Sequence, residues 1–338
     1  MASILANYGT RNHDIYLITL DSKVPFYELK EKVTLDQAPV QITSSNKKKR
    51  FFTNGLWLRK TVKRINPDVV CSFGEKYNPY ALLFLTGLNI PVYVANRASP
   101  LTYLRGIKGF ITPFAYKLAA GVVLQTQKSK DLLQPRYIMK NTVVIGNPID
   151  LDYPENEQKP IVLNVGSIGG DKNQDWLIEY FKDVRPSTPE GWQLHFVGDG
   201  PNRSNCEQLV KDKGIAESVV FQGIQKDPKP FYSQSAIFAF TSTSEGFPNA
   251  LAEAMAAGCA CIAYDCIAGP SDIIDNGVNG FLIPEGDEEQ YKEKLKLLMN
   301  NPELRERFGK AAREKMKKFE ASEVAERFFS FITERVKV

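Results

Sequence analysis

Residues 241–258 read TSTSEGFPNALAEAMAAG and hold two glutamates, Glu245 and Glu253, around Gly-Phe-Pro-Asn. The apolar run AIFAFT that leads into this stretch has the composition of a buried parallel strand. Pro248 suits the first turn of a helix, and the good helix formers after it continue that helix. We therefore expect Glu245 at the carboxyl end of a strand and Glu253 about a turn and a half into the next helix.

The start of this predicted helix is suited to binding an anion. At a helix start the backbone N–H groups of Gly246, Asn249 and Ala250 lack partners, and the helix dipole adds positive potential there. The two flanking carboxylates accept hydrogen bonds from hydroxyl groups. A single ligand that carries both phosphates and hydroxyls would use both features.

The chain of 338 residues has an ordinary globular composition, with 43% hydrophobic and 24% charged residues. Its length predicts two domains. No apolar run approaches the ~18 residues that span a bilayer. The five cysteines lack a Cys-x-x-Cys pair and there are only two histidines, which argues against a disulfide framework and a histidine-rich metal site. We expect a cytoplasmic protein.

Charge is distributed unevenly along the chain. Residues 1–150 contain 21 Lys and Arg against 9 Asp and Glu, whereas residues 151–338 contain 22 against 30. Two halves of opposite sign support two domains, and the basic first half is predicted to meet an anionic partner.

Strands alternate with helices along almost the whole chain, which predicts parallel sheets covered by helices on both faces. The alternation breaks at 147–160, a polar segment with three prolines that is typical of a linker. We expect domains at 1–150 and 151–320 and a terminal helix at 321–338 that packs back on the first domain. Two such domains would face each other across a cleft lined by the carboxyl ends of strands.

The chain begins with a helix-like stretch that runs straight into the apolar strand DIYLITL. A complete doubly wound domain has a first strand and a phosphate-binding turn before such a helix. One interpretation is an N-terminal helix on the sheet edge. The favoured one is a chain that lacks roughly 15–25 residues at its N-terminus, which is one strand and one turn.

The second half resembles the retaining glycosyltransferases of family 4, and the resemblance covers most of the chain. Its most specific element is the Glu-x7-Glu motif from Glu245 to Glu253. The supporting matches are VGSIGGDKN (165–173), VGDGP (197–201), VVFQGI (219–224) and AGPSDIIDNGVNGFLIP (268–284). The resemblance implies the α/β GT-B fold, two Rossmann-like doubly wound domains, with an acceptor-binding domain followed by a donor-binding one.

The resemblance also implies roles for individual residues. Glu253 would take the ribose diol of a nucleotide-sugar, Glu245 would face the donor sugar, and Lys172 would hold the departing phosphate. Ser167 stands where the family usually has arginine, so stabilisation of the leaving group would be weaker or shared. The alternatives are a solvated helix glutamate for Glu253 and an exposed surface lysine for Lys172. The full set of expected donor-binding residues is Glu253, Gly246, Phe247, Pro248, Asn249, Ala250, Ser167, Gly198 and Ile224.

The family's mechanism retains the anomeric configuration without a side-chain nucleophile, because the leaving diphosphate helps to deprotonate the acceptor hydroxyl. No metal and no cofactor are expected, since the nucleotide-sugar is a substrate and the family normally needs no metal. UDP is the preferred nucleotide on family frequency alone. Donor sugar, acceptor, linkage and oligomeric state stay open.

On the acceptor side, VANRASP (94–100) places Arg97 where many relatives have a histidine. Arg97 is expected to act in catalysis by binding phosphate or orienting the acceptor, with a structural ion pair as the alternative. A glycan or polyprenyl-diphosphate-linked glycan is the expected acceptor.

Residues 41–67 contain eight Lys and Arg, no acid, and interleaved aromatic residues. The stretch 47–64 is expected to contact an anionic membrane at its inner face, helped by Arg105 and Lys108. The alternative is a solvated helix face with a packed apolar side. Nothing else in the chain indicates nucleic-acid binding.

Two rival functions share these features. One is a nucleotide-sugar-binding subunit with weak or no catalytic activity, which the missing first strand, Ser167 and the absent histidine favour. The other is a GT-B epimerase or phosphorylase, which product analysis would separate from a transferase.

Overall fold

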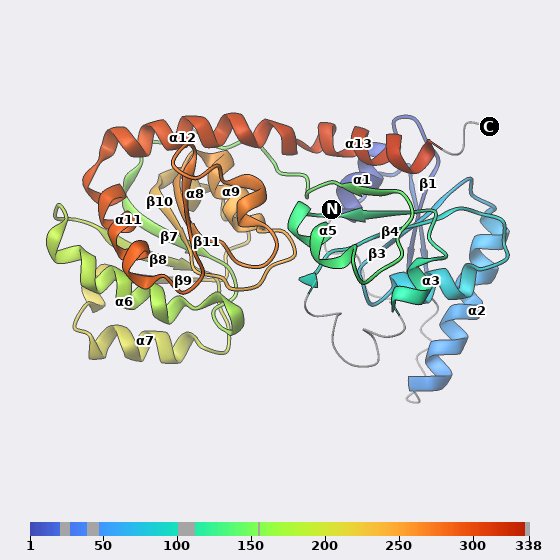
Figure 1. The fold of residues 1–338 in the computed structure, drawn as a ribbon, viewed down its shortest axis with the longest axis horizontal. Coiled ribbons are helices and arrows are strands. Elements are labelled where there is room, and N and C mark those ends of the chain that lie inside the picture. The colour runs from blue at the N-terminus through green and yellow to red at the C-terminus, as the bar shows by residue number, and fades with distance from the viewer. Residues whose placement is uncertain (21–27, 39–46, 101–111, 155, 335–338) are drawn as a thin grey trace. The chain divides into compact units, whose positions relative to one another are not determined.

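The structure, a computed structural model, describes residues 1–20, 28–38, 47–100, 112–154 and 156–334, with the backbone alone for 47–49. The chain separates into two compact units (Figure 1). The first unit contains Met1–Pro148 and Ala321–Val338, and the second contains Ile149–Glu320.

The second unit is built on a six-stranded sheet in which every strand runs parallel to its neighbours. Its order is β12-β11-β10-β7-β8-β9, so the chain moves from β7 to one edge and then returns to the other side of β7. The six strands predicted in this half are confirmed. They are β7 (Lys159–Val165), β8 (Gln193–Val197), β9 (Val219–Gly223), β10 (Ser235–Phe240), β11 (Ala260–Tyr264) and β12 (Gly280–Ile283).

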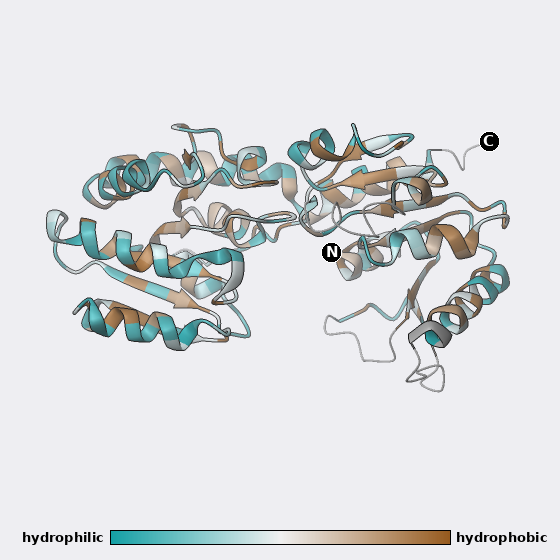
Figure 2. Cartoon of the chain, turned by 60° about the horizontal axis from the view of Figure 1, so that its bottom comes forward, coloured by the Kyte–Doolittle hydropathy of each residue, from teal (hydrophilic) through white to brown (hydrophobic). Residues whose placement is uncertain are grey.

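Helices cover both faces of this sheet, as the repeated β-α units predict. Along β10, Ile237 and Ala239 belong to one hydrophobic core, while Phe238 and Phe240 belong to the core on the opposite face. Figure 2 shows hydrophilic and hydrophobic residues alternating along the surrounding helices. These helices are α6 (Gln174–Val184), α7 (Arg203–Asp212), α8 (Lys229–Gln234), α9 (Asn249–Ala257), α10 (Pro270–Ile273), α11 (Glu288–Asn300) and α12 (Pro302–Met316).

The first unit contains a four-stranded parallel sheet in the sequential order β3-β4-β5-β6, and a separate parallel pair, β1 and β2. The sequence predicts all of these strands except β2, whose residues VTLDQ lack an apolar run. The strands are β1 (Ile15–Thr19), β2 (Val33–Gln37), β3 (Val70–Phe73), β4 (Val92–Ala95), β5 (Gly121–Leu124) and β6 (Thr142–Val144). The helices are α1 (Ala2–Gly9), α2 (Lys47–Ile65), α3 (Asn78–Leu85) and α5 (Gln127–Leu133), with 112–116 also helical.

The last helix, α13 (Ala321–Thr333), lies beside α1 in the first unit (Figure 1). Its apolar face enters the same core as strand β4, and Phe328 stacks on Phe73 with ring centroids 5.8 Å apart. Tyr8 of α1 donates a 2.9 Å hydrogen bond to Glu326 of α13. Residues from the two ends of the sequence therefore build one core.

Candidate functional site

The strand order of the second unit reverses between β7 and β10. These two strands pair directly, so the loops that follow them leave the same edge of the sheet side by side. In open parallel sheets, ligands bind outside the carboxyl ends of strands at such a reversal. Lys172 lies in the loop after β7 and Glu245 in the loop after β10.

The structure joins these two predicted residues in a salt bridge between Lys172 Nζ and Glu245 Oε1. The side chains are 31% and 13% exposed, so the pair is reachable from solvent. The loops are also tied through their backbones: Thr241 Oγ1 donates 2.7 Å to the Lys172 carbonyl, and the Thr243 N–H donates 2.8 Å to the Asp171 carbonyl. A ligand that enters here meets a lysine and a carboxylate held at one place.

Glycines shape the loop edge next to this salt bridge. Gly198, after β8, has φ +136°, and a Cβ there would overlap the carbonyl oxygen of Gly166 after β7. The two loops therefore approach backbone to backbone, which only glycine permits. A Cβ on Gly166 itself would meet nothing within 4 Å, and Ser167 beside it is exposed. Open space thus lies beside Ser167, the predicted donor-binding residue in the loop after β7.

Helix α9 begins close to where the sequence predicts, with one correction. Pro248 has ψ 73° and precedes the helix instead of lying in its first turn, so the first helical residue is Asn249. The Asn249 N–H donates 2.9 Å to the Phe247 carbonyl and is therefore not available, contrary to the prediction. Within the described residues, the N–H groups of Gly246 and Ala250 have no acceptor. Two of the three N–H groups predicted to bind an anion at this helix start thus remain available.

The Phe247 side chain is a structural contact in this structure. It is buried, and its ring lies 5.6 Å from the ring of Phe319. Gly269, in the loop after β11, packs against Pro248, where a Cβ would collide with the proline ring. Phe247 and Pro248 thereby hold the start of α9 in place beneath Glu245.

Glu253 is largely buried on α9. Its Oε2 accepts a 2.9 Å hydrogen bond from the hydroxyl of Tyr232, a fully buried residue of α8. Burial raises the pKa of the Glu253 carboxyl; the Tyr232 bond lowers it and Asp150 raises it further. This environment does not fit the alternative of a solvated helix glutamate. A carboxylate held in this way is a strong acceptor for ligand hydroxyls.

Sequence reasoning missed the group that surrounds Glu253. The ring of Tyr153 lies edge-on to Tyr232 at 6.2 Å, and Lys229 donates 2.7 Å to Asp150 and stands 5.6 Å from the Tyr153 ring. The available signal was Tyr232 itself, because a buried tyrosine hydroxyl needs a hydrogen-bond partner. The segment before Pro154, which the sequence assigns to a linker, therefore supplies groups next to the predicted ribose site.

Ile224 completes the predicted donor set at the edge strand. It follows Gly223, which has φ +68°, and its side chain is 80% exposed. An apolar side chain presented to solvent at the carboxyl end of β9 offers a surface for a flat ring. The predicted donor residues thus all come from one unit and lie after β7, β8, β9 and β10 or on α9.

Arg97 belongs to the first unit, directly after β4. The Glu75 carboxylate accepts hydrogen bonds from the backbone N–H groups of Arg97 and Ala98, at 2.7 and 2.8 Å. The guanidinium itself donates from Nη1 to Asn147 at 3.0 Å. Within the described residues no salt bridge involves Arg97, so the expected alternative of a structural ion pair is not what the structure shows.

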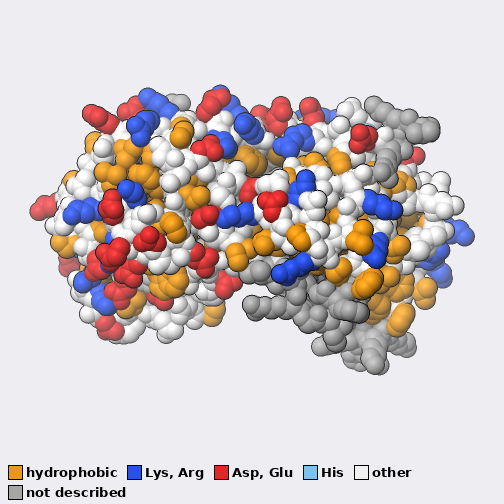
Figure 3. Space-filling model, viewed as in Figure 1, with side chains coloured by type: hydrophobic (Ala, Val, Ile, Leu, Met, Phe, Trp, Pro, Cys, Tyr) orange, Lys and Arg blue, Asp and Glu red, His pale blue; other side chains and the backbone are white. Residues whose placement is uncertain are grey.

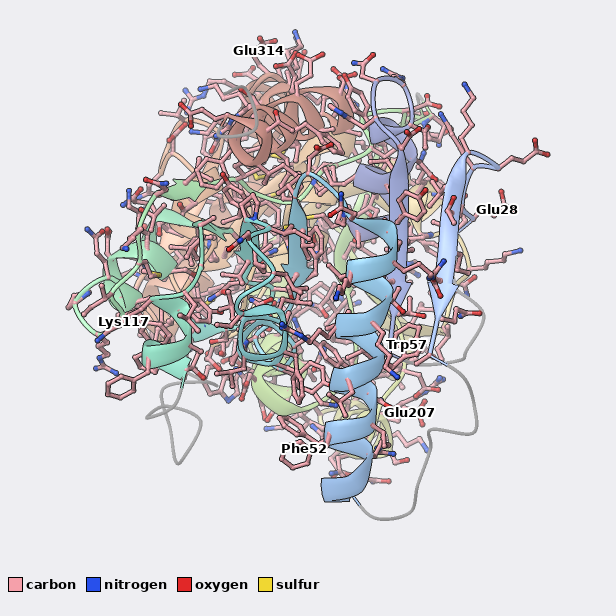
Figure 4. The ribbon with its side chains drawn as sticks, turned by 90° about the vertical axis from the view of Figure 1, so that its right-hand side faces the viewer. Glu28, Phe52, Trp57, Lys117, Glu207 and Glu314 are labelled. Carbon is pink, nitrogen blue, oxygen red and sulfur yellow. The ribbon has the colours of Figure 1, made fainter. Side chains whose placement is uncertain are left out.

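Helix α2 carries the predicted basic surface. Phe51, Phe52 and Leu56 are exposed, and Figure 4 shows Phe52 extending from the helix. Over this part of the first unit, Figure 3 shows hydrophobic side chains among Lys and Arg, whereas acidic side chains gather on the second unit. The exposed basic residues are Arg50, Lys60, Lys63 and Arg64.

Three predictions on this surface fall outside what is described: the side chains of Lys47, Lys48 and Lys49, and the residues Arg105 and Lys108. Among the described helices, none combines the length and apolar character needed to cross a membrane. The alternative of a helix whose apolar side is packed does not account for the exposed Phe52, which is 61% accessible.

Two glycosyltransferase family models match successive parts of the chain. Residues 149–315 match the model for glycosyl transferases group 1, and residues 2–153 match that for glycosyltransferase family 4. The chain is 29% identical to the amylovoran biosynthesis glycosyltransferase AmsD of Erwinia amylovora over 326 residues, 92% of this chain and 88% of that protein.

A second relative is an alpha-1,4-N-acetyl-D-galactosaminyltransferase of Campylobacter jejuni, named for a diphosphoundecaprenol-linked glycan. It is 24% identical over 341 residues, 98% of this chain and 93% of that protein. Among solved structures, a mutant of S. aureus TarM in complex with fondaparinux, alpha-GlcNAc-glycerol and UDP superimposes with a TM-score of 0.72 at 21% identity. That match covers 82% of this chain but only 59% of the longer TarM chain.

Proposed function

The chain is a glycosyltransferase of the group 1 and family 4 type with the GT-B fold, and from that premise we propose that it transfers a sugar from a UDP-sugar to a hydroxyl of a glycan with retention of configuration. One relative is named for amylovoran biosynthesis and another for a diphosphoundecaprenol-linked glycan. The observation that carries the proposal is the Lys172–Glu245 salt bridge beside the start of α9.

We propose that the donor exchanges the partners of this salt bridge. The diphosphate would take Lys172 and the free N–H groups of Gly246 and Ala250, all of which favour negative charge. Glu245 would then be released toward a hydroxyl of the donor sugar. Each member of the salt bridge thus gains a new partner from the same ligand: the diphosphate for Lys172 and a hydroxyl donor for Glu245.

The rest of the nucleotide fits the neighbouring residues. Glu253 would accept hydrogen bonds from the ribose hydroxyls, and the base would lie against Ile224. Gly166 leaves room for its backbone to approach the ligand, and Gly198 packs directly against Gly166. Phe247 and Pro248 would position the helix start, and Ser167 would line the phosphate side without adding charge.

In the proposed reaction the bond between the anomeric carbon and the diphosphate oxygen breaks. The acceptor oxygen bonds to the same face of that carbon, and its proton passes to the departing diphosphate. Lys172 stabilises the negative charge that develops on the diphosphate. Lys172 and the start of α9 supply positive charge, which supports our proposal that the reaction needs no metal.

We further propose a lipid-linked glycan as acceptor and a peripheral contact with the cytoplasmic face of an anionic membrane. The support is the exposed surface of α2, where Phe51, Phe52 and Leu56 stand among Arg50, Lys60 and Lys63. Basic residues near anionic lipid contribute ~1 kcal/mol each, and exposed aromatic side chains add insertion into the interface.

The second candidate function is a nucleotide-sugar-binding subunit that does not turn the donor over. Ser167 favours this candidate. It stands where the family usually has an arginine, so Lys172 is left as the cation of the loop after β7 that can stabilise the leaving group. Measurable sugar transfer to an acceptor would exclude this candidate, whereas tight UDP binding without transfer would support it.

The deciding experiment is calorimetric titration of UDP and GDP with EDTA present. The full chain should bind UDP, and Glu253→Ala should weaken that binding ~10–100-fold, as expected for the loss of a charge-assisted hydrogen bond. Glu217→Ala, an exposed glutamate in the same unit, is the matched control and should bind as the parent does. Equal affinity of the parent and Glu253→Ala would overturn the assignment of the ribose site.

A further inference from the structure

The guanidinium of Arg97 has two nitrogens whose hydrogen-bonding capacity is unused. Nη1 donates to Asn147, but Nε and Nη2 are excluded from solvent and have no hydrogen-bond partner within the described residues. Burial lowers the pKa of Arg97 to about 10, so the group is still cationic at neutral pH. Buried polar groups are nearly always paired, and an unpaired one indicates a partner that is absent or a functional role.

The neighbouring polar groups are committed elsewhere. Asn147 Oδ1 also accepts a 2.7 Å bond from Gln125, and Glu75 Oε1 is used by the backbone of Arg97 and Ala98. Burial raises the pKa of the Cys71 thiol to about 12, so Cys71 is neutral. The ring of Phe73 lies 5.2 Å from the guanidinium carbon. The ring of Phe73 thus supports the cation, and no carboxylate of the described residues is hydrogen-bonded to Nε or Nη2.

These groups converge at the carboxyl edge of the first unit's sheet. Phe73 ends β3 and Glu75 follows it, Arg97 follows β4, Gln125 follows β5 and Asn147 lies beyond β6. This edge is where parallel sheets bind ligands. Each of the four strands therefore contributes to the surroundings of Arg97.

A buried polar network holds the Arg97 loop rigid from below. Tyr116 donates 2.6 Å to Asn96 Oδ1, and Asn78 Nδ2 donates to Tyr116 Oη at 3.1 Å and to the Ala95 carbonyl at 3.2 Å. Asn96 immediately precedes Arg97. These hydrogen bonds fix the backbone that leads into Arg97 and so limit the positions that the guanidinium can take.

We infer that the Nε–Nη2 edge of Arg97 is a binding site for an oxyanion, a phosphate or a carboxylate, held by two parallel hydrogen bonds. This edge of a guanidinium matches the spacing of two oxygens of such a group. The site itself follows from Arg97 and its neighbours. Assigning the anion to the acceptor substrate rests on the proposed transferase function.

Entry to the site requires a local rearrangement, because neither nitrogen contacts solvent in this structure. Anion binding should therefore be slower than an encounter at an open surface. An ordered water that satisfies Nε and Nη2 is the competing explanation, and it predicts no response to added anion.

The test is nitrogen NMR of the full chain labelled at arginine, with the Arg97 Nε signal assigned through Arg97→Lys. Inorganic phosphate, pyrophosphate and acetate are titrated separately at constant ionic strength, with sodium chloride as the reference. We expect a saturable shift of the Arg97 signal. A larger response to pyrophosphate identifies a phosphate-bearing acceptor, and a larger response to acetate identifies an acidic sugar. An Arg97 signal that none of the three anions shifts beyond chloride would overturn the proposal.

Pyrophosphate can also reach Lys172, so Lys172→Ala is the matched variant and should keep the full shift at Arg97. Arg97→Gln should weaken pyrophosphate binding about 10-fold or more in that background. Should Arg97→Gln fail to fold, the signal of the unmutated residue still decides. A shift at Arg97 together with no binding of UDP would leave the anion site standing and remove the proposed function.

Discussion

The hydroxyl of Tyr232 on α8, a residue of the hydrophobic core of the second unit, donates a 2.9 Å hydrogen bond to Oε2 of Glu253 on α9. Burial raises the pKa of this carboxyl and the Tyr232 bond opposes that rise. Tyr232 therefore keeps a buried acid available as an acceptor, and we propose that it positions Glu253 for the ribose hydroxyls.

The first prediction concerns Tyr232→Phe. Loss of a bond that lowers the Glu253 pKa should raise that pKa, so the pH below which UDP binding weakens should move upward. Loss of orientation should also weaken binding about 3- to 10-fold. Calorimetry from pH 5 to 8 measures both, and comparison with the parent at each pH cancels the titration of UDP itself.

Tyr180→Phe is the matched control for Tyr232→Phe. This variant also removes a buried hydroxyl, which in the parent lies 2.9 Å from the hydroxyl of Tyr264. Tyr180, however, belongs to the core on the other face of the sheet. Its affinity and pH profile should equal those of the parent. Identical pH profiles for Tyr232→Phe and Tyr180→Phe would rule out the positioning role.

The second prediction is that Glu253→Gln stabilises the fold at neutral pH. Burial raises the pKa of Glu253 in the folded state above its ordinary value of 4.5. At pH values between the unfolded-state pKa and the folded-state pKa, the folded state therefore binds more protons than the unfolded state. Stability attributable to Glu253 is therefore present at low pH and is lost as the pH rises through that window. Urea unfolding at pH 5 and pH 7.5 should show a gain for Glu253→Gln that is larger at pH 7.5. A gain of equal size at both pH values would contradict the prediction.

The third prediction separates the two members of the Lys172–Glu245 salt bridge. Lys172→Ala should weaken UDP binding about 10-fold, because it removes the positive charge that is proposed to bind the diphosphate. Glu245→Gln should bind UDP as tightly as the parent or more tightly, since Lys172 no longer has a competing carboxylate, while sugar transfer falls at least ~10-fold.

A loss of UDP affinity in Lys172→Ala without a loss in Glu245→Gln distinguishes this mechanism from a purely structural salt bridge, in which both variants would lose affinity. The pair is partly exposed, so its removal should alter stability by about 1 kcal/mol or less and both variants should fold. Calorimetry with UDP and a radiolabelled transfer assay provide the two readouts.

The fourth prediction concerns the backbone contact at Gly198. Gly198→Ala places a methyl group on the Gly166 carbonyl at φ +136°, and should destabilise the fold by about 3 kcal/mol. Gly286→Ala is the control: its φ is +84° but nothing lies within 4 Å of the added carbon, so about 1 kcal/mol is expected. Urea unfolding followed by circular dichroism measures both, and equal losses would refute the steric explanation.

The fifth prediction tests the surface of α2. Phe52→Ser should reduce binding to vesicles of phosphatidylglycerol and phosphatidylcholine several-fold, because an exposed aromatic ring no longer enters the interface. Ile138→Ser, which removes an exposed apolar side chain elsewhere in the first unit, should leave vesicle binding unchanged. Sedimentation with the vesicles gives the bound fraction. Equal binding by Phe52→Ser and the parent would support a merely solvated helix.

The strands and helices that carry the candidate site could be read from local patterns. Parallel strands such as β10 are buried on both faces, so they are continuous apolar runs that a single sequence displays. Gly258 ends α9 in the left-handed conformation that its type favours. Strand β2 was missed because its partner β1, and not its own residues, makes it a strand.

Residue types and spacing were therefore enough to place Glu245 after a strand and Glu253 on a helix, and to indicate a ligand with phosphates and hydroxyls. Contacts between distant residues were not accessible in that way: Lys172 meets Glu245 across 73 positions and Tyr232 meets Glu253 across 21. The same holds for the Asn249 N–H that proved to be occupied and the Arg97 nitrogens that proved to be unpaired. Hydrogen bonding and desolvation depend on which groups the fold brings within about 3 Å, and the order of the strands sets that proximity.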